Sequence, residues 1–210
     1  LEYYTPVLRF TTKGVFPMAG QMVEIRWHAR GGQGAKTAAM FLAEAVLVKG
    51  KFGQGFPEYG PERRGAPMRG FTRIADEPIR RHCMIERPGI VIVLDPTLLD
   101  SPAAGVTAGT DKDTVFVINT TEDGDFIRKK LDVKGAQVHT VDATGIALDT
   151  IGRAIPNMPM IGALLAVDDI MTVEELKDAL VAQLSSKFSQ AVIDGNLAAV
   201  ERANKELVSA

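Results

Sequence analysis

Short hydrophobic runs alternate with longer helical patterns along the chain. Residues 90–94 form a continuous aliphatic run, and residues 114–119 and 137–142 repeat it, the last more weakly. Such runs are typical of strands covered on both faces in a parallel sheet. The segments 122–131 and 144–153 have helical periodicity. The alternation predicts an α/β fold with a doubly wound, mostly parallel sheet and flanking helices.

The pattern near the N-terminus predicts a strand, a tight turn and a helix. Residues 23–27 alternate apolar and polar side chains, and a glycine-rich turn at 30–34 leads into an Ala- and Leu-rich pattern at 35–49. The helix has few charges, so most of its circumference should be buried. Residues 52–56 and 68–75 predict two more strands. The turn at 76–78 adds a possible small antiparallel hairpin between 68–75 and the residues from 79 onward.

The C-terminal third predicts helices. Residues 160–167 form a short apolar helix, 172–184 begin with a capping box, and 189–207 are amphipathic. Residues 1–21 show no clear period, so we expect an N-terminal extension at 1–21 and a single domain at 22–210.

Composition narrows the class of protein. A chain of 210 residues with 46% hydrophobic content can bury one good core. The net charge of −2 argues against a general nucleic-acid binder. No run of about 20 apolar residues could cross a bilayer and no signal-peptide pattern is present, so we expect a cytoplasmic protein without a membrane partner.

Cys83 is the only cysteine in the chain. An internal disulfide, a cysteine-ligated iron–sulfur cluster and a structural zinc site within this chain are therefore excluded. We expect Cys83 to be a small buried hydrophobe in a strand or bend. The three histidines lack metal-ligand spacing and are interpreted as structural.

Three predicted strands end in a carboxylate or an amide: Asp95, Asn119 and Asp142. The carboxyl ends of strands line the ligand crevice of open α/β sheets, so these side chains are candidates for one edge of a site. Asp and Asn equally cap the helix or turn that follows a strand, and the sequence does not separate the two roles.

The loop at 56–67 is the chain's most unusual segment. Three prolines and two glycines restrict its path, which favours a rigid loop that presents polar groups to something outside the domain. Pairing of its charges at a solvated surface is the simpler alternative, and each such pair contributes about 0 to 1 kcal/mol. The candidate residues for a substrate route or a subunit interface are Glu58, Tyr59, Glu62, Arg63 and Arg64.

The glycine turn consists of Arg30, Gly31, Gly32, Gln33 and Gly34. Backbone N–H groups at a helix start form a natural anion site, and glycines allow a phosphate or carboxylate to approach closely. The spacing fits neither the dinucleotide fingerprint nor the Walker loop. The glycines could also serve only the tight turn.

Together, the segments 27–34 and 56–67 closely resemble the gamma subunit of 2-oxoacid:ferredoxin oxidoreductases, most like the pyruvate synthase branch. The resemblance extends from residue 23 to about residue 207 and includes 155–163. It implies a complex that oxidatively decarboxylates pyruvate or a related 2-oxoacid with coenzyme A, giving acyl-CoA, carbon dioxide and reduced ferredoxin, or runs the reverse synthesis.

The resemblance also implies where the cofactors lie. Thiamine diphosphate, Mg and the iron–sulfur clusters would belong to partner subunits of the alpha, beta and delta types, with coenzyme A as co-substrate and none of these cofactors held by this chain alone. The glycine turn and the loop would face the route of substrate and coenzyme A, and no residue of this chain would act as acid, base or nucleophile.

Two other classes stay open at this point. One is a self-sufficient nucleotide-binding α/β enzyme, which strong thermal stabilisation of the purified chain by a dinucleotide would indicate. The other is a purely structural subunit whose loop holds the assembly together without touching a ligand.

Overall fold

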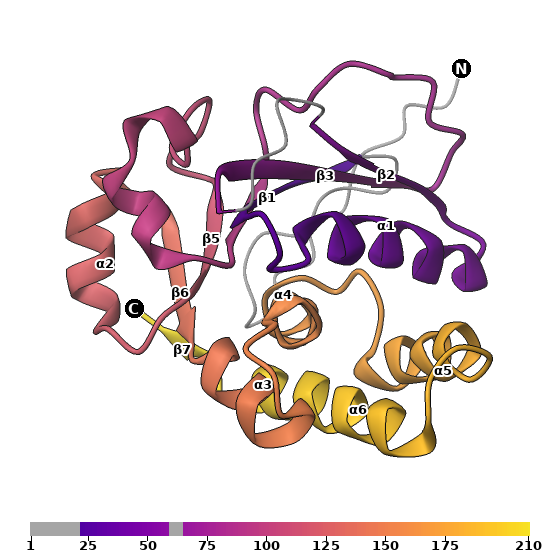
Figure 1. The fold of residues 1–210 in the computed structure, drawn as a ribbon. Helices are drawn as coiled ribbons and strands as arrows, with labels where there is room; N and C mark the ends of the chain where they lie inside the picture. The colour runs from indigo at the N-terminus through magenta and orange to yellow at the C-terminus, as the bar shows by residue number, and fades with distance from the viewer. Residues whose placement is uncertain (1–21, 59–64) are drawn as a thin grey trace, which may run out of the picture.

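A computed structural model describes residues 22–58 and 65–210 of the chain (Figure 1). Its strands are β1 (Val23–Arg30), β2 (Phe52–Pro57), β3 (Pro67–Ala75), β4 (Ile90–Val93), β5 (Val115–Asn119), β6 (Gln137–Val141) and β7 (Val208–Ser209). The α-helices are α1 (Ala35–Ala45), α2 (Gly124–Leu131), α3 (Ala143–Ile151), α4 (Asn157–Val167), α5 (Val173–Leu184) and α6 (Gln190–Lys205). Three short 3-10 helices are η1 (Val46–Lys49), η2 (Pro96–Asp100) and η3 (Pro102–Ala104).

The described strands form one sheet in the order β2-β3-β1-β4-β5-β6-β7. The neighbours β1, β4, β5 and β6 pair in parallel, whereas β3 is antiparallel to both β1 and β2, and β7 is antiparallel to β6. Five strands therefore point in one direction, which confirms the predicted α/β class with its mostly parallel sheet.

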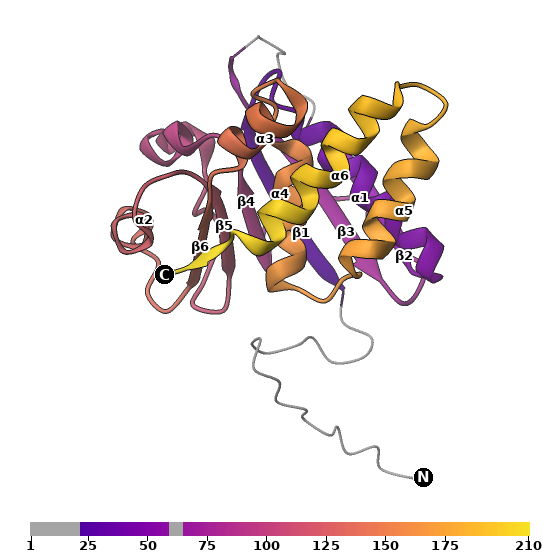
Figure 2. The same ribbon diagram turned by 90° about the horizontal axis from the view of Figure 1, so that it is seen from below.

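Helices cover both faces of the sheet (Figures 1 and 2). On one face α1, α3, α4, α5 and α6 contribute to a large apolar core, and on the other α2 packs with the η2–η3 segment over β4, β5 and β6. Strand β4 supplies both cores: Ile90 and Ile92 face the first, and Val91 and Val93 face the second. The uninterrupted apolar run at 90–94 follows from this double burial.

Helix α4 lies at the centre of the larger layer. Its residues from Asn157 to Leu165 are all buried, as expected for a helix that is apolar around its whole circumference. Gly162 makes this possible on the α6 side, because a Cβ built there would lie 2.2 Å from the Val200 carbonyl oxygen. The two helices therefore pack at backbone contact.

Helix α1 lies close against β2 and β3. A Cβ built on Gly53 would lie 1.9 Å from the Ala43 oxygen, and one on Gly55 would lie 2.6 Å from the Ala39 oxygen. Glycine in the strand and alanine in the helix thus let the two backbones approach to a distance that a larger residue would prevent.

Two expectations from the sequence are wrong. The predicted hairpin partner of β3 does not form: the residues from 79 to 89 form no strand, and β3 pairs with β1 and β2 instead. Ladders from two neighbours satisfy both edges of β3, which leaves no edge for a local hairpin. Cys83 lies in a bend but is exposed, and the Arg73 guanidinium donates Nη2 to its carbonyl at 2.7 Å and lies 3.8 Å from its Sγ.

None of the described helices is long and apolar enough to cross a membrane.

Candidate functional site

The glycine turn lies where the strand order of the sheet reverses. After β1 the chain turns into α1 and continues to β2 and β3 on one side, whereas after β4 it continues through η2 to β5 on the other. Since β1 and β4 are parallel neighbours, their carboxyl ends flank this switch point. Open α/β sheets commonly bind ligands at such a point.

Four side chains, which we call the Arg30 cluster, join the ends of β1 and β4: Arg30, Gln33, Asp95 and Thr97. Gln33 accepts from the Arg30 N–H at 2.7 Å and donates Nε2 to Asp95 Oδ2 at 2.8 Å. The same carboxylate oxygen lies 3.4 Å from Arg30 Nε. Asp95 Oδ1 accepts from the Thr97 hydroxyl at 2.6 Å, and that hydroxyl accepts from Arg30 Nη2 at 2.9 Å.

The cluster keeps the Asp95 carboxyl ionised. Burial would raise the pKa of Asp95, but hydrogen bonds from Thr97 and Gln33, together with the Arg30 charge, outweigh it and hold this pKa below its ordinary value. Asp95 also caps η2 through the Thr97 N–H at 3.0 Å. The capping role therefore holds for Asp95, in addition to its place beside the switch point.

The turn and the described end of the loop are in direct contact. The Gly31 N–H donates to the Ala66 carbonyl at 3.1 Å, and Arg30 Nη1 donates to the Gly65 carbonyl at 3.1 Å. Strand register brings them together, because Arg30 at the end of β1 lies opposite Pro67 at the start of β3. The glycine turn and the loop thus adjoin at Gly65 and Ala66.

Most amides of the turn already have internal partners. Gly31 N–H bonds to Ala66, and Gln33 N–H donates to the Arg30 carbonyl at 3.2 Å. Gly32 is exposed with φ 103°, and a Cβ built on it would meet no atom within 4 Å. Gly34, with φ 86°, caps α1 and packs so closely against Asn157 that a Cβ there would lie 2.7 Å from Asn157 Nδ2.

Of the predicted loop residues, only Glu58 lies in the described part of the chain. It pairs with Arg69 of β3 through both guanidinium Nε and Nη2, the latter 2.6 Å from Oε1, and both side chains stay about one-third exposed, at 28% and 33%. The hydrogen bond to Glu58 raises the pKa of Arg69. Glu58 thus forms an ion pair, as the simpler interpretation of the loop charges expects. Tyr59, Glu62, Arg63 and Arg64 lie outside the described residues.

Two fully buried polar side chains, Arg26 and His28, lie on the same face of the sheet as the Arg69–Glu58 pair. The sequence did not predict their arrangement. Arg26 donates Nε to His28 Nε2 at 2.9 Å and Nη2 to the Val106 carbonyl at 2.9 Å. Burial, followed by the charge of Arg26, lowers the pKa of His28 to about 3, so the ring is a neutral acceptor. Burial likewise lowers the pKa of Arg26 to about 10.

The available signal was the strict alternation along β1. Polar residues stand at positions 24, 26, 28 and 30, and apolar Ile25, Trp27 and Ala29 belong to the core below α1. Period-2 alternation usually indicates a solvent-exposed polar face. Here the polar face is covered as well. The alternation therefore predicts which side chains of β1 share a face, but not that the polar face is buried.

A hollow lies at the carboxyl ends of β4, β5 and β6. It encloses about 460 Å³ beside the Arg30 cluster and shares Thr97 with it. Asn119 and Asp142 both line it, as expected from their positions after strands, although Asp142 also caps α3 through the Gly145 N–H at 2.7 Å. The carboxylates of Asp100, Glu122 and Asp142 outnumber the one cation of its lining, Lys130, so the hollow does not favour a phosphate.

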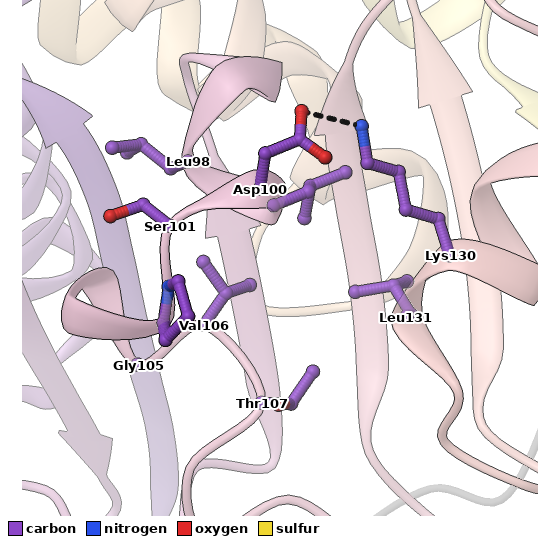
Figure 3. A pocket seen from close by; sticks show the side chains of 10 residues that line it. Leu98, Asp100, Ser101, Gly105, Val106, Thr107, Lys130 and Leu131 are labelled. Atoms are coloured by element: carbon purple, nitrogen blue, oxygen red, sulfur yellow. Dashed lines mark hydrogen bonds and ion pairs between the residues drawn. The ribbon is translucent and has the colours of Figure 1, made fainter.

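A smaller hollow separates the η2–η3 segment from α2 (Figure 3). It holds about 170 Å³ and is bridged by an ion pair in which Lys130 Nζ lies 2.7 Å from Asp100 Oδ2. Leu98, Val106 and Leu131 form its apolar floor. Its size and its closing ion pair suit a packing gap between two surface segments.

The described residues offer no ligand set for a metal ion. No three His, Cys, Asp or Glu side chains converge within residues 22–58 and 65–210. The site is therefore a polar junction of hydrogen-bonded side chains, without a metal centre of its own in that part of the chain.

The fold and the site define an α/β domain with a polar, hydrogen-bonded junction at the switch point of its sheet. Comparison with known proteins identifies the family. Residues 24–206 match the family described as pyruvate ferredoxin/flavodoxin oxidoreductase. The chain belongs to this family, as a gamma-type subunit of a pyruvate or 2-oxoacid:ferredoxin oxidoreductase.

The relatives cover nearly the whole chain. Pyruvate synthase subunit PorC of Thermotoga maritima is 48% identical over 191 residues, which are 91% of this chain and 97% of the relative. The common subunit gamma of the pyruvate/ketoisovalerate oxidoreductases of Thermococcus kodakarensis is 43% identical over 188 residues, 89% and 98% of the two chains.

Solved structures share the fold. The crystal structure of the pyruvate oxidoreductase subunit PORC from Thermotoga maritima has a TM-score of 0.79 at 45% identity, covering 90% of this chain and 98% of that one. A 2-oxoglutarate:ferredoxin oxidoreductase from Magnetococcus marinus has a TM-score of 0.70 at 21% identity, and the match covers 32% of its chain. The latter likeness concerns the fold alone.

Proposed function

We propose that this chain serves a complex that converts pyruvate, or a related 2-oxoacid, and coenzyme A to acyl-CoA and carbon dioxide with reduction of ferredoxin, or runs the reverse synthesis. The match over residues 24–206 to a single oxidoreductase family carries the proposal. Alpha-, beta- and delta-type subunits would complete the enzyme. Thiamine diphosphate with Mg and the iron–sulfur clusters, held on those subunits, supply the carbanion and electron-transfer chemistry.

The role of this chain in that enzyme is to form one wall of the route for substrate and coenzyme A. The contact between Gly31 and Ala66 supports this role, because it joins the glycine turn and the loop into one surface. Among the described residues, that surface exposes the Gly32 backbone and the Arg30 side chain, which is 33% exposed. Coenzyme A and oxoacids are anions, which arginine binds through charge-assisted hydrogen bonds.

The Arg30 cluster would position this surface without entering the reaction. Asp95 and Thr97 hold the guanidinium, and Gln33 ties the turn to the end of β4. Arg63 and Arg64, from the loop, would add positive charge toward the anions. In this scheme the chain binds and orients, and proton and electron transfer belong to the partner subunits.

The decisive experiment replaces both Arg63 and Arg64 with Gln in the intact complex. We expect the KM for coenzyme A or for the oxoacid to rise about tenfold or more, because each lost charge-assisted hydrogen bond is worth about 1.5–3 kcal/mol. Arg80→Gln with Arg81→Gln is the matched control, since this exposed pair lies on the segment between β3 and β4. Unchanged Michaelis constants would leave only a structural role for the loop.

A separate measurement tests the class of protein. Native complex purified through this chain should contain thiamine, iron and acid-labile sulfide together with companion subunits. A chain that purifies alone and is strongly stabilised by a dinucleotide would instead indicate a self-sufficient nucleotide-binding enzyme.

A further inference from the structure

The two edges of the described sheet are built differently. At one edge β7, a strand of only two residues, closes β6. At the other, β2 runs for six residues, Phe52–Pro57, and pairs only with β3. Proteins commonly protect sheet edges with very short strands, charges, prolines or bulges. The first edge follows that rule, whereas β2 contains no charged residue and has a proline only at its last position, Pro57.

The N–H and C=O groups of β2 that point away from β3 belong mainly to two glycines. In an antiparallel pair alternate residues bond to the neighbour, and the Glu58 N–H that donates to the Arg69 carbonyl at 2.9 Å fixes which ones. Gln54 and Phe56 have the same parity as Glu58 and therefore bond to β3. The N–H and C=O groups of Gly53 and Gly55 point away from the sheet and have no partner among the described residues.

Exposed apolar side chains surround this edge. Met40 is 38% exposed on α1, Phe52 is 41% exposed at the start of β2, and Leu47 and Val48 of η1 are 54% and 79% exposed. The neighbouring cations are neutralised, because Lys49 pairs with Glu175 at 2.9 Å and Lys51 with Asp76 at 3.8 Å. The edge therefore favours an uncharged, extended apolar segment.

Helix α1 covers this end of the sheet on one face, packed against both β2 and β3 and at backbone contact with Gly53 and Gly55. An incoming strand would therefore lie beside α1, where Met40 and Val48 are exposed. Relatives of this chain are named as subunits of oxidoreductases, so a companion subunit is the neighbour that such an edge would meet. A second copy of this chain is the alternative occupant, and the exchange experiment below distinguishes the two.

We propose that β2 accepts a strand from another subunit of the same oxidoreductase, which extends the sheet across the subunit boundary. Main-chain hydrogen bonds to Gly53 and Gly55 would provide the pairing, and Met40, Val48 and Phe52 would bury the flanking side chains. The proposal takes from the family only that the chain works as a subunit, and it is independent of the role assigned to the loop.

Hydrogen exchange of the full chain, alone and in the purified complex, tests the pairing directly. The Gly53 and Gly55 amides should exchange fast in the isolated chain and at least about tenfold more slowly in the complex, whereas those of Gln54 and Phe56 should be protected in both. Fast exchange of the two glycines in the complex would overturn the proposal. Their protection in the isolated monomer, or in a concentration-dependent homodimer, would overturn it as well.

A variant tests the flanking contacts. Phe52→Lys should reduce co-purification of companion subunits, because it buries a charge in the apolar rim of the new pairing. Phe188→Lys is the control, since Phe188 is 51% exposed in the segment between α5 and α6 and belongs to neither β2 nor α1. Equal recovery of the complex with both variants, at unchanged thermal stability, would count against the proposal. Reduced recovery with Phe52→Lys supports the pairing whether or not the Arg63 and Arg64 variant raises the KM, so the two proposals fail separately.

Discussion

Gln33 connects the ends of two parallel strands with a single side chain, since it donates to Asp95 at 2.8 Å while accepting from the Arg30 N–H at 2.7 Å. The glycine turn is thereby tied to the end of β4. Such a clamp at the switch point of the sheet keeps Arg30 in place even when nothing is bound.

Replacing Gln33 with Ala should lower the free energy of unfolding by about 1–3 kcal/mol, because a backbone N–H and a partly buried carboxylate both lose a partner. Urea unfolding of the two proteins measures the difference. Gln190→Ala is the control: its side chain bonds to Asp194 at 2.8 Å on the exposed surface of α6, so a change within about 0.5 kcal/mol is expected. Equal effects of the two substitutions would contradict the clamp.

Gly53→Ala should destabilise the protein by about 1–3 kcal/mol or more, since the added methyl would lie 1.9 Å from the Ala43 oxygen and must displace α1. Thermal unfolding reports the loss. Gly89→Ala provides the comparison, because a Cβ there meets only the Glu24 oxygen at 3.9 Å. That variant should be neutral or slightly more stable, and a neutral Gly53→Ala would show that α1 can move away from β2.

Acid should destabilise the fold through His28. Its pKa is about 3 in the folded protein and about 6.5 when unfolded, so the unfolded chain binds the extra proton between these values. The stability that His28 provides is complete above about pH 6.5 and is lost as the pH falls toward 3, with a slope of up to about 1.4 kcal/mol per pH unit.

His28→Gln keeps a hydrogen-bond acceptor for Arg26 but cannot titrate. Its unfolding free energy should therefore fall less steeply between pH 6.5 and 4 than that of the unchanged protein. His82→Gln, at an exposed position, should keep the original slope. If the His28 variant kept it too, the buried ring would not be the titrating group.

Asp168 should act in the opposite direction. Burial, followed by the charge of Asp169, raises its pKa to about 6, although Lys51 partly opposes the shift. A raised pKa means that the folded state holds the proton more tightly, so this contribution is present below about pH 4 and is lost as the pH rises through 6. Asp168→Asn should raise stability at pH 7 relative to the exposed control Asp178→Asn, as measured by urea unfolding.

Local patterns identified most elements of the fold. The aliphatic run at 90–94 became β4, and the capping box of Thr172 and Glu175 opens α5 with both reciprocal hydrogen bonds. These features depend on neighbours in sequence, which is why a single chain reveals them. The strand at 52–56 was also predicted correctly, as β2.

Contacts between residues far apart in the sequence were harder to predict. The turn at 76–78 suggested a local hairpin, but β3 paired with strands that come earlier in the chain, as in the register of Thr72 with Ile25 and Gly55. The Gln33 side chain bonds to Asp95, which lies 62 residues later in the chain, and no pattern around the turn indicates that partner. Burial of Arg26 depends on coverage by the segment at 105–106, which no periodicity along β1 could indicate.

The hydrogen bond from the Gly31 N–H to the Ala66 carbonyl has a mechanical consequence. Ala66 belongs to the loop and Gly31 to the bend that precedes α1, so a displacement of one without the other costs this hydrogen bond. We therefore expect the bend and the described end of the loop to shift as one unit whenever either is displaced.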